Sequence, residues 1–126
     1  MKLIVTALIG KMELEPIRDI FNLDILKIAA KKSLQGLGKN IKSTVEISGT
    51  ILSKVYLTSS DGAGRVVFLL KVKDEKSVLI MIRHKNDKRI GANMTVQNTK
   101  FRKVLEKNLD LILSDLKKGD YEEIEL

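Results

Sequence analysis

The chain has 126 residues, of which 44% are hydrophobic and 31% are charged. This length suits one folded domain, residues 1–126, and the composition lies far from that of disordered chains. The absence of cysteine excludes disulfides, thiolate metal sites and cysteine nucleophiles, and no apolar run approaches the roughly 18 residues of a membrane-spanning helix. The net charge of +7 is compatible with a nucleic-acid or an acidic protein partner, and composition alone does not favour either over a basic protein without such a partner.

The first third of the chain predicts a strand followed by helices. Residues 2–9 are apolar and partly β-branched, and no small-x-small cleavage site follows them, so they indicate a strand and not a signal peptide. Pro16 lies where a first helical turn tolerates proline. Apolar residues then recur at helical spacing to about residue 39. Asn22 is a candidate N-cap that divides this run into two helices, and Gly36 and Gly38 end it.

The middle of the chain predicts a three-stranded antiparallel meander. Residues 50–57, 65–72 and 77–83 are dense in branched apolar residues, and TSSDGAG and KDEK between them have the composition of turns. The third of these strands is apolar on both faces. It is therefore either a central strand covered on both sides or one whose second face is partly exposed.

A C-terminal helix is predicted over residues 98–119, NTKFRKVLEKNLDLILSDLKKG, which carry a broad apolar stripe. Thr95 or Asn98 is the candidate N-cap, and the lysines before Gly119 suit the C-terminal end of a helix dipole. The expected order is an N-terminal strand, a helix or helical hairpin, the meander and the C-terminal helix. This is an α+β domain with helices packed on one small sheet.

Basic residues gather on the hairpin and at the end of the third strand. If the first turn centres near Ser60 and Asp61, Tyr56 lies opposite Arg65. The same face of the hairpin then also presents Lys54 and Lys71. The third strand ends in further cations beside the single histidine of the chain, and the basic residues of this segment are Arg83, His84, Lys85, Lys88 and Arg89.

Such a group of residues suits metal-independent cleavage of RNA. Cations hold a phosphodiester and stabilise the charge that grows on its oxygens, a histidine supplies an acid or a base, and RNA brings its own nucleophile in the 2′-hydroxyl. The same residues also fit a site without function: His84 as a surface histidine, Lys71 on a solvated strand face, and residues 85–89 as a charged, solvated loop. No metal site is expected, because one histidine stands without well-spaced carboxylates.

The segments GTILSKVYLTSSDGAGRVVFLLKV and SVLIMIRHKND resemble the core of the RelE/ParE superfamily of bacterial toxins, and the resemblance extends over about residues 45–113. It implies a RelE-like sheet with packed helices. It also implies that Arg65 contacts the scissile phosphate, that Lys54 is a basic RNA contact, and that the cluster Arg83, His84 and Lys85 holds the acid or transition-state stabiliser. The resemblance does not assign the general base. Some members use a glutamate on the first strand of the hairpin, and Glu46 lies near that position but does not align with it.

As a function, the resemblance implies a cytoplasmic toxin that cuts mRNA within the ribosome, leaves a cyclic phosphate and needs no cofactor. The partners it implies are mRNA, the ribosome and a cognate antitoxin protein, with no membrane. In this reading Arg65, Arg83 and His84 are catalytic. The residues expected to bind RNA are Lys54, Lys71, Lys85, Lys88 and Arg89.

Two alternatives remain. Ribonuclease members of the superfamily often carry a tyrosine soon after the basic cluster, and this chain has none between Tyr56 and Tyr121. That difference favours a toxin of the same fold that binds a protein target such as DNA gyrase. The other alternative is a non-catalytic, basic nucleic-acid-binding domain, although three Phe, two Tyr and no Trp offer little surface for base stacking.

Overall fold

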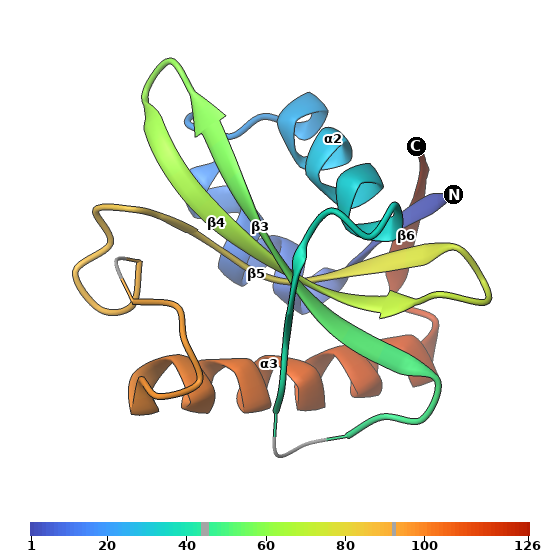
Figure 1. The fold of residues 1–126 in the computed structure, drawn as a ribbon. Coiled ribbons are helices and arrows are strands. Elements are labelled where there is room, and N and C mark those ends of the chain that lie inside the picture. Colours follow the sequence, from blue (N-terminus) through green and yellow to red (C-terminus); the bar gives the residue numbers. More distant parts are fainter. Residues whose placement is uncertain (44–45, 92) are drawn as a thin grey trace.

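The computed structural model describes residues 1–43, 46–91 and 93–126, and in these residues six strands form one open sheet (Figure 1). Their order across the sheet is β2-β3-β4-β5-β1-β6. The contact of β1 with β5 is parallel and the other strand contacts are antiparallel. The strands are β1 (Lys2–Thr6), β2 (Lys39–Ile41), β3 (Thr50–Ser59), β4 (Gly62–Lys71), β5 (Lys76–His84) and β6 (Tyr121–Glu125). The predicted α+β class is confirmed.

The predicted meander is confirmed as β3, β4 and β5, with strands longer than expected. The β3–β4 turn is confined to Ser60 and Asp61, and the register places Tyr56 opposite Arg65 and Lys54 opposite Val67, as predicted. β5 lies inside the sheet, and its residues from Val78 to Ile82 are buried. The run of apolar residues on both faces of β5 is thus explained by cover from both sides.

The N-terminal strand is shorter than predicted, because the chain turns helical after Thr6. α1 (Ala7–Ile9), a π-helical turn η1 (Gly10–Leu14) and a 3-10 turn η2 (Glu15–Ile17) follow one another without a break. The Asp115 carboxylate, from the far end of the chain, accepts the N–H of Leu8 at 3.0 Å and so caps the start of α1. A cap supplied by a distant segment leaves no local signal in the sequence.

The predicted division at Asn22 is confirmed. The Asn22 side chain accepts the N–H of Ile25 at 3.0 Å and begins α2 (Leu23–Leu34). α2 ends earlier than residue 39, because Gly36 takes a φ of +78°, a left-handed conformation that favours glycine. The residues that follow form β2, which the sequence did not predict.

The helices cover the two faces of the sheet, with α2 on one side and α3 (Thr99–Lys118) on the other (Figure 1). Asn98 caps α3 through a bond from the N–H of Lys100 at 3.0 Å, and Gly119 ends it with a φ of +73°. The buried side chains of α3 include Phe101, Leu105, Leu109 and Ile112. The prediction of this helix is confirmed at both ends.

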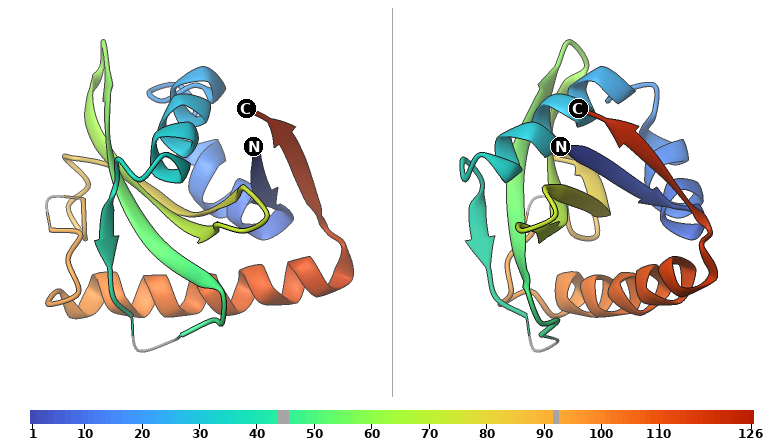
Figure 2. Two further views of the ribbon diagram at one scale, coloured as in Figure 1. Left: turned by 45° about the vertical axis from the view of Figure 1, so that its right-hand side comes forward. Right: turned by 90° about the vertical axis from the view of Figure 1, so that its right-hand side faces the viewer.

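β6 is a second strand that the sequence did not predict. It follows α3 directly and pairs with β1, so the two strands lie side by side in both views of Figure 2. Lys2 and Lys76 bind Glu123 at 3.1 and 3.2 Å and so balance part of the negative charge of β6. The acidic tail therefore forms an edge of the sheet.

A β-bulge in β5 fixes where α3 crosses the sheet. Val67 pairs with Met81 and Phe68 with Leu79, so Ile80 is an extra residue in β5. Its carbonyl accepts a bond from Nδ2 of the buried Asn108 at 3.0 Å. The amide side chain of α3 thus satisfies a backbone group that the bulge would otherwise leave unpaired.

Candidate functional site

The second half of β5 has an open side. β1 pairs with β5 only through Val78, because β1 turns into α1 soon afterwards. On that side the Glu13 carboxylate accepts the N–H of Ile82 at 3.0 Å and forms an ion pair with Arg83. The Glu13 side chain is only 3% exposed. A buried carboxylate from the π-helical turn therefore takes the place of a neighbouring strand and orients the first cation of the predicted cluster.

His84 links the end of β5 to the β3–β4 turn. Its Nδ1 accepts the N–H of Asn86 at 3.0 Å, so we assign the proton of the neutral ring to Nε2, which lies 3.3 Å from the carbonyl oxygen of Asp61. A Cβ on Gly62 would lie 2.5 Å from Nε2 and would displace the imidazole, and the φ of +132° also favours glycine there. The imidazole thus bonds to backbone groups on both sides.

The segment after β5 is shaped by Asp87. Its carboxylate accepts the N–H groups of Arg89 and Ile90 at 2.9 and 3.1 Å and lies 3.6 Å from Nε of Arg83. Burial would raise the pKa of Asp87, but the backbone bonds from Ile90 and Arg89 and the charge of Arg83 together lower it. The carboxylate therefore stays ionised and curls residues 87–91 into a compact turn.

Lys54 and Arg65 hold this segment onto the sheet. Nζ of Lys54 donates to the carbonyl of Met94 at 2.9 Å, and Arg65 donates to the carbonyl of Gly91. Burial lowers the pKa of Lys54, whose side chain is only 5% exposed. Arg65 also lies over the Tyr56 ring, with Cζ 5.3 Å from the ring centroid. These two cations serve the fold of the segment in this structure, and their predicted contact with RNA stays a prediction.

The predicted catalytic residues lie on two faces of the sheet. Arg65 pairs with Arg83 across β4 and β5, so both leave the same face, whereas His84 pairs with Gly64 and leaves the other. On that other face the His84 ring lies 6.2 Å from the ring of Phe21. The structure therefore brings Arg65 and Arg83 together and separates His84 from Arg65.

The predicted RNA contacts divide in the same way. Lys71 ends β4, six residues from Arg65 and therefore roughly 20 Å along the strand, so it lies apart from the cluster. Lys85 donates its N–H to the carbonyl of Ala63 at 2.8 Å and exposes its side chain. Lys88 and Arg89 are exposed on the segment after β5.

Three adjoining hollows surround Arg89. One of about 550 Å³ includes Glu13, Arg83 and His84 in its lining, one of about 510 Å³ extends from Asp87 to Lys100, and one of about 350 Å³ adjoins the first turns of α3. Arg89 lines all three. The cations that line them form a group that we call the Arg89 surface: Arg83, Lys88, Arg89, Lys100 and Lys103.

Lys100 and Lys103 were missed from the sequence. They lie one helical turn apart at the start of α3 and line the 350 Å³ hollow with Arg83 and Arg89. Their three-residue spacing on a helix that starts beside the basic segment was the available signal. Glu13 was also missed, because nothing in the sequence places it against β5.

Neither a metal centre nor a membrane helix is found in the described part of the chain. Residues 1–43, 46–91 and 93–126 contain no group of three or more His, Cys, Asp or Glu side chains that could hold a metal ion. In the same residues no helix is long and apolar enough to cross a membrane.

The comparisons gave no relative. Models of known protein families, curated proteins and solved structures were searched, and none matched the chain. The resemblance to the RelE/ParE superfamily therefore rests only on the sequence segments quoted for it.

Proposed function

We propose that the chain is a RelE/ParE-like toxin that binds RNA through the Arg89 surface and cleaves mRNA on the ribosome. The observation that carries the proposal is the convergence of five cations on three hollows that share Arg89, one of which also holds His84 and Glu13. In this proposal the toxin acts in the cytoplasm and is neutralised by a cognate antitoxin protein.

The charge and spacing of these cations suit a phosphodiester backbone. Arg83 and Arg89 line two of the hollows together, and Lys100 continues the row onto α3. One guanidinium group can bind two phosphate oxygens at once, whereas a lysine acts as a point charge. A single strand that crosses Arg89 would meet cations in each hollow, and the release of counterions would drive its binding.

The hollow of about 550 Å³ holds groups for acid–base chemistry. In the proposed reaction the 2′-hydroxyl gives its proton to Glu13 and attacks the adjacent phosphorus, and the bond from phosphorus to the 5′-oxygen breaks. For this step the bond from the N–H of Asn86 to Nδ1 has to open, so that His84 carries a proton on both ring nitrogens. His84 then gives its Nε2 proton to the 5′-oxygen, which leaves a 2′,3′-cyclic phosphate and a 5′-hydroxyl. Arg83 and Arg89 stabilise the negative charge on the phosphoryl oxygens.

The test is translation of a reporter mRNA in a purified ribosome system, with primer extension to map breaks. We expect breaks only when ribosomes are present, and their loss in His84→Gln and Glu13→Gln, which keep hydrogen-bonding groups at these positions. Lys117→Gln/Lys118→Gln, which changes two exposed lysines at the opposite end of α3, is the matched control and should cleave normally. Intact mRNA with normal translation would overturn the proposal of cleavage.

One observation favours a second candidate, a nucleic-acid-binding domain or protein-targeting toxin without nuclease activity. Both ring nitrogens of His84 face backbone groups, and Lys54 and Arg65 bind carbonyls of the segment after β5. These bonds would have to rearrange for catalysis. RNA binding without cleavage would support the binding domain, and inhibition of gyrase supercoiling would support the protein-targeting toxin.

A further inference from the structure

β6 has an unpaired side. It is the outermost strand of the sheet formed by the described residues. The N–H of Ala7 donates to the carbonyl of Asp120, and the N–H of Leu126 to that of Met1, which sets the alternation of bonded pairs between β1 and β6. Tyr121, Glu123 and Glu125 therefore turn their N–H and C=O groups away from β1, toward the open edge.

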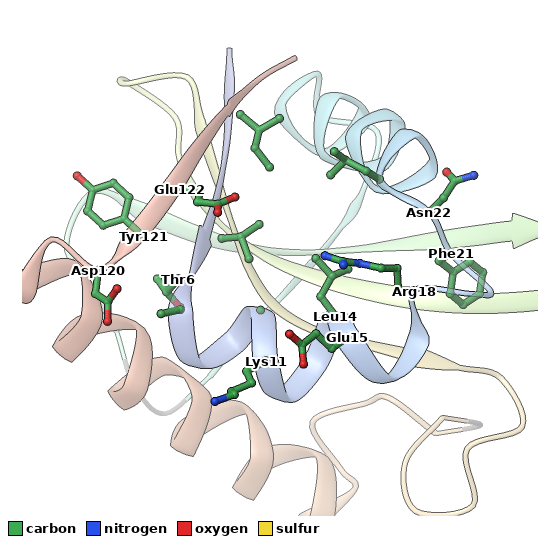
Figure 3. Close-up of a pocket in the computed structure, with 15 residues that line it drawn as sticks. Thr6, Lys11, Leu14, Glu15, Arg18, Phe21, Asn22, Asp120, Tyr121 and Glu122 are labelled. Atoms are coloured by element: carbon green, nitrogen blue, oxygen red, sulfur yellow. The ribbon is translucent and has the colours of Figure 1, made fainter.

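A hollow of about 780 Å³ adjoins this strand (Figure 3). Its apolar lining includes Val5, Leu14, Phe21 and Ile124. Glu122 lies opposite Val5 in the β1–β6 pairing, and in Figure 3 its carboxylate turns toward the hollow while the Tyr121 ring points away. Side chains of any strand added beside Glu122 and Ile124 would alternate in the same way, with every second one above the hollow.

A buried polar atom in the wall of this hollow has no partner. Thr6 lines the hollow and is fully buried, and its Oγ1 makes no hydrogen bond with any described residue. Such groups are rare in folded proteins, because a buried hydroxyl without a partner is unfavourable. Because Oγ1 is closed to solvent in this structure, a group in the hollow would satisfy it only if the wall around Thr6 moved.

The charges around β6 select the chemistry of a partner. Asp120 and Glu122 line the hollow from the β6 side, while Glu123 is already bound by Lys2 and Lys76 on the opposite face. The far wall carries Lys11, Glu15 and Arg18, so carboxylates outnumber cations in the lining by three to two. A second copy of β6 would place carboxylates against carboxylates, whereas a basic segment would meet opposite charges.

We propose that β6 is a docking strand for an extended, basic segment of a partner protein, which pairs with its open edge and places its basic side chains over the adjoining hollow, beside Glu122. Main-chain bonds to Tyr121, Glu123 and Glu125 provide affinity, and the hollow together with Glu122 provides specificity for an alternating apolar and basic sequence. The open edge of β6 lies at the end of α3 opposite the Arg89 surface, while the hollow extends to Phe21, whose ring lies 6.2 Å from that of His84.

The test uses the full chain and a short labelled peptide of alternating lysine and valine. We expect saturable binding in fluorescence anisotropy, and slower amide hydrogen exchange at Tyr121, Glu123 and Glu125 when the peptide is bound. The same peptide with N-methyl groups on alternate amides should not bind, since it lacks the donors for strand addition. An alternating glutamate and valine peptide should give no added protection at these three amides, even if it binds the basic end.

Matched variants locate the site. Glu123→Pro and Glu123→Ala lose the same ion pairs, but only the proline loses the outward N–H, so we expect roughly fivefold weaker peptide binding for Glu123→Pro than for Glu123→Ala. Binding without added protection at the outward amides, equal binding by the two variants, or protein self-association through β6 in place of peptide binding would overturn the proposal. If Glu123→Pro does not fold, the exchange measurement on the unmodified chain decides.

Discussion

The two ends of α3 lie in opposite electrostatic surroundings. Its first turns carry Lys100 and Lys103 beside the Arg89 surface, and its last turn leads through Gly119 into the acidic strand β6. At the basic end, the Asp87 carboxylate and the cations Lys54 and Arg65 bind backbone groups of residues 89–91 and 94, while Lys88 and Arg89 stay exposed. At the acidic end, Lys2 and Lys76 bind Glu123, and the outer edge of β6 pairs with no other strand of the described residues.

If both proposals hold, this difference teaches that one small domain can present two kinds of recognition. In the proposed function, side chains around Arg89 bind a polyanion chiefly through its charge. In the proposed docking, backbone groups of β6 bind another strand chiefly through its extended backbone. The variants below test this contrast, because each changes either the stability of the fold or the affinity of one end of α3 for its ligand.

The largest effect is expected at Glu13. Glu13→Ala leaves the N–H of Ile82 and the guanidinium of Arg83 without their carboxylate, in a site where the Glu13 side chain is 3% exposed. We expect a loss of about 3 kcal/mol in the free energy of unfolding. Urea denaturation measures it, and Glu15→Ala, an exposed neighbour, should change stability by less than about 0.5 kcal/mol. A loss for Glu13→Ala as small as that for Glu15→Ala would contradict the role of Glu13 as cover for β5.

Asn108 should rank second. Asn108→Ala removes the donor that satisfies the carbonyl of the bulge residue Ile80, and both groups are buried. A loss of about 2 kcal/mol is expected, because an unpaired buried acceptor loses its solvation without a replacement. Thermal and urea unfolding of Asn108→Ala and of Lys107→Ala, at an exposed position beside it, provide the comparison. Equal stability of the two variants would show that the Asn108 bond does not position α3.

The basic end can be weakened without touching the core. Lys100→Gln/Lys103→Gln should reduce affinity for a short single-stranded RNA roughly tenfold near 0.1 M salt, and should lower the salt slope by about 0.7 for each phosphate that the protein no longer neutralises. Fluorescence anisotropy over a salt series measures both quantities. Lys117→Gln/Lys118→Gln removes the same charge at the acidic end and should change affinity much less. A similar loss of affinity in both double variants would mean that RNA binding depends on the net charge of the protein and not on the Arg89 surface.

The smallest effect is a pH dependence from Asp87. Because its pKa is lowered in the folded state, its ionisation stabilises the fold above the unfolded pKa of about 3.9, and this contribution is lost as the pH falls through the folded pKa. Asp87→Asn should therefore be less stable than the unmodified chain by about 1 kcal/mol at pH 7. Urea unfolding at a series of pH values should show the gap closing below about pH 4. A gap independent of pH would mean that the charge of Asp87 is not what stabilises the turn.

Local chemistry made much of the fold predictable. The caps at Asn22 and Asn98 and the left-handed Gly36 act within a few residues, and the β3–β4 register follows from a tight turn and the alternation of side chains. β6 was missed for the opposite reason. Its glutamates favour no strand by themselves, and pairing with β1, ion pairs with Lys2 and Lys76 and the packing of Ile124 against the core hold it in the sheet.

The site was predictable only in part. The sequence indicated that Lys54, Tyr56 and Arg65 share a face, but alternation does not reveal what covers a face, and here the segment after β5 covers Lys54 and Arg65. The same alternation could have shown that Arg65 and His84 leave opposite faces, had the β4–β5 register been known. Glu13 reaches β5 only because the chain turns helical after Thr6, which is a tertiary event.

The most direct test of the contrast between the two ends is an NMR titration of the full chain, labelled with ¹⁵N, with a short single-stranded RNA. We expect saturable shifts at the backbone amides of residues 83–91 and 99–104, and none at residues 121–125. Shifts that centre on β6, or no saturable shift near Arg89, would contradict the assignment of the basic end of α3 as the surface that binds RNA.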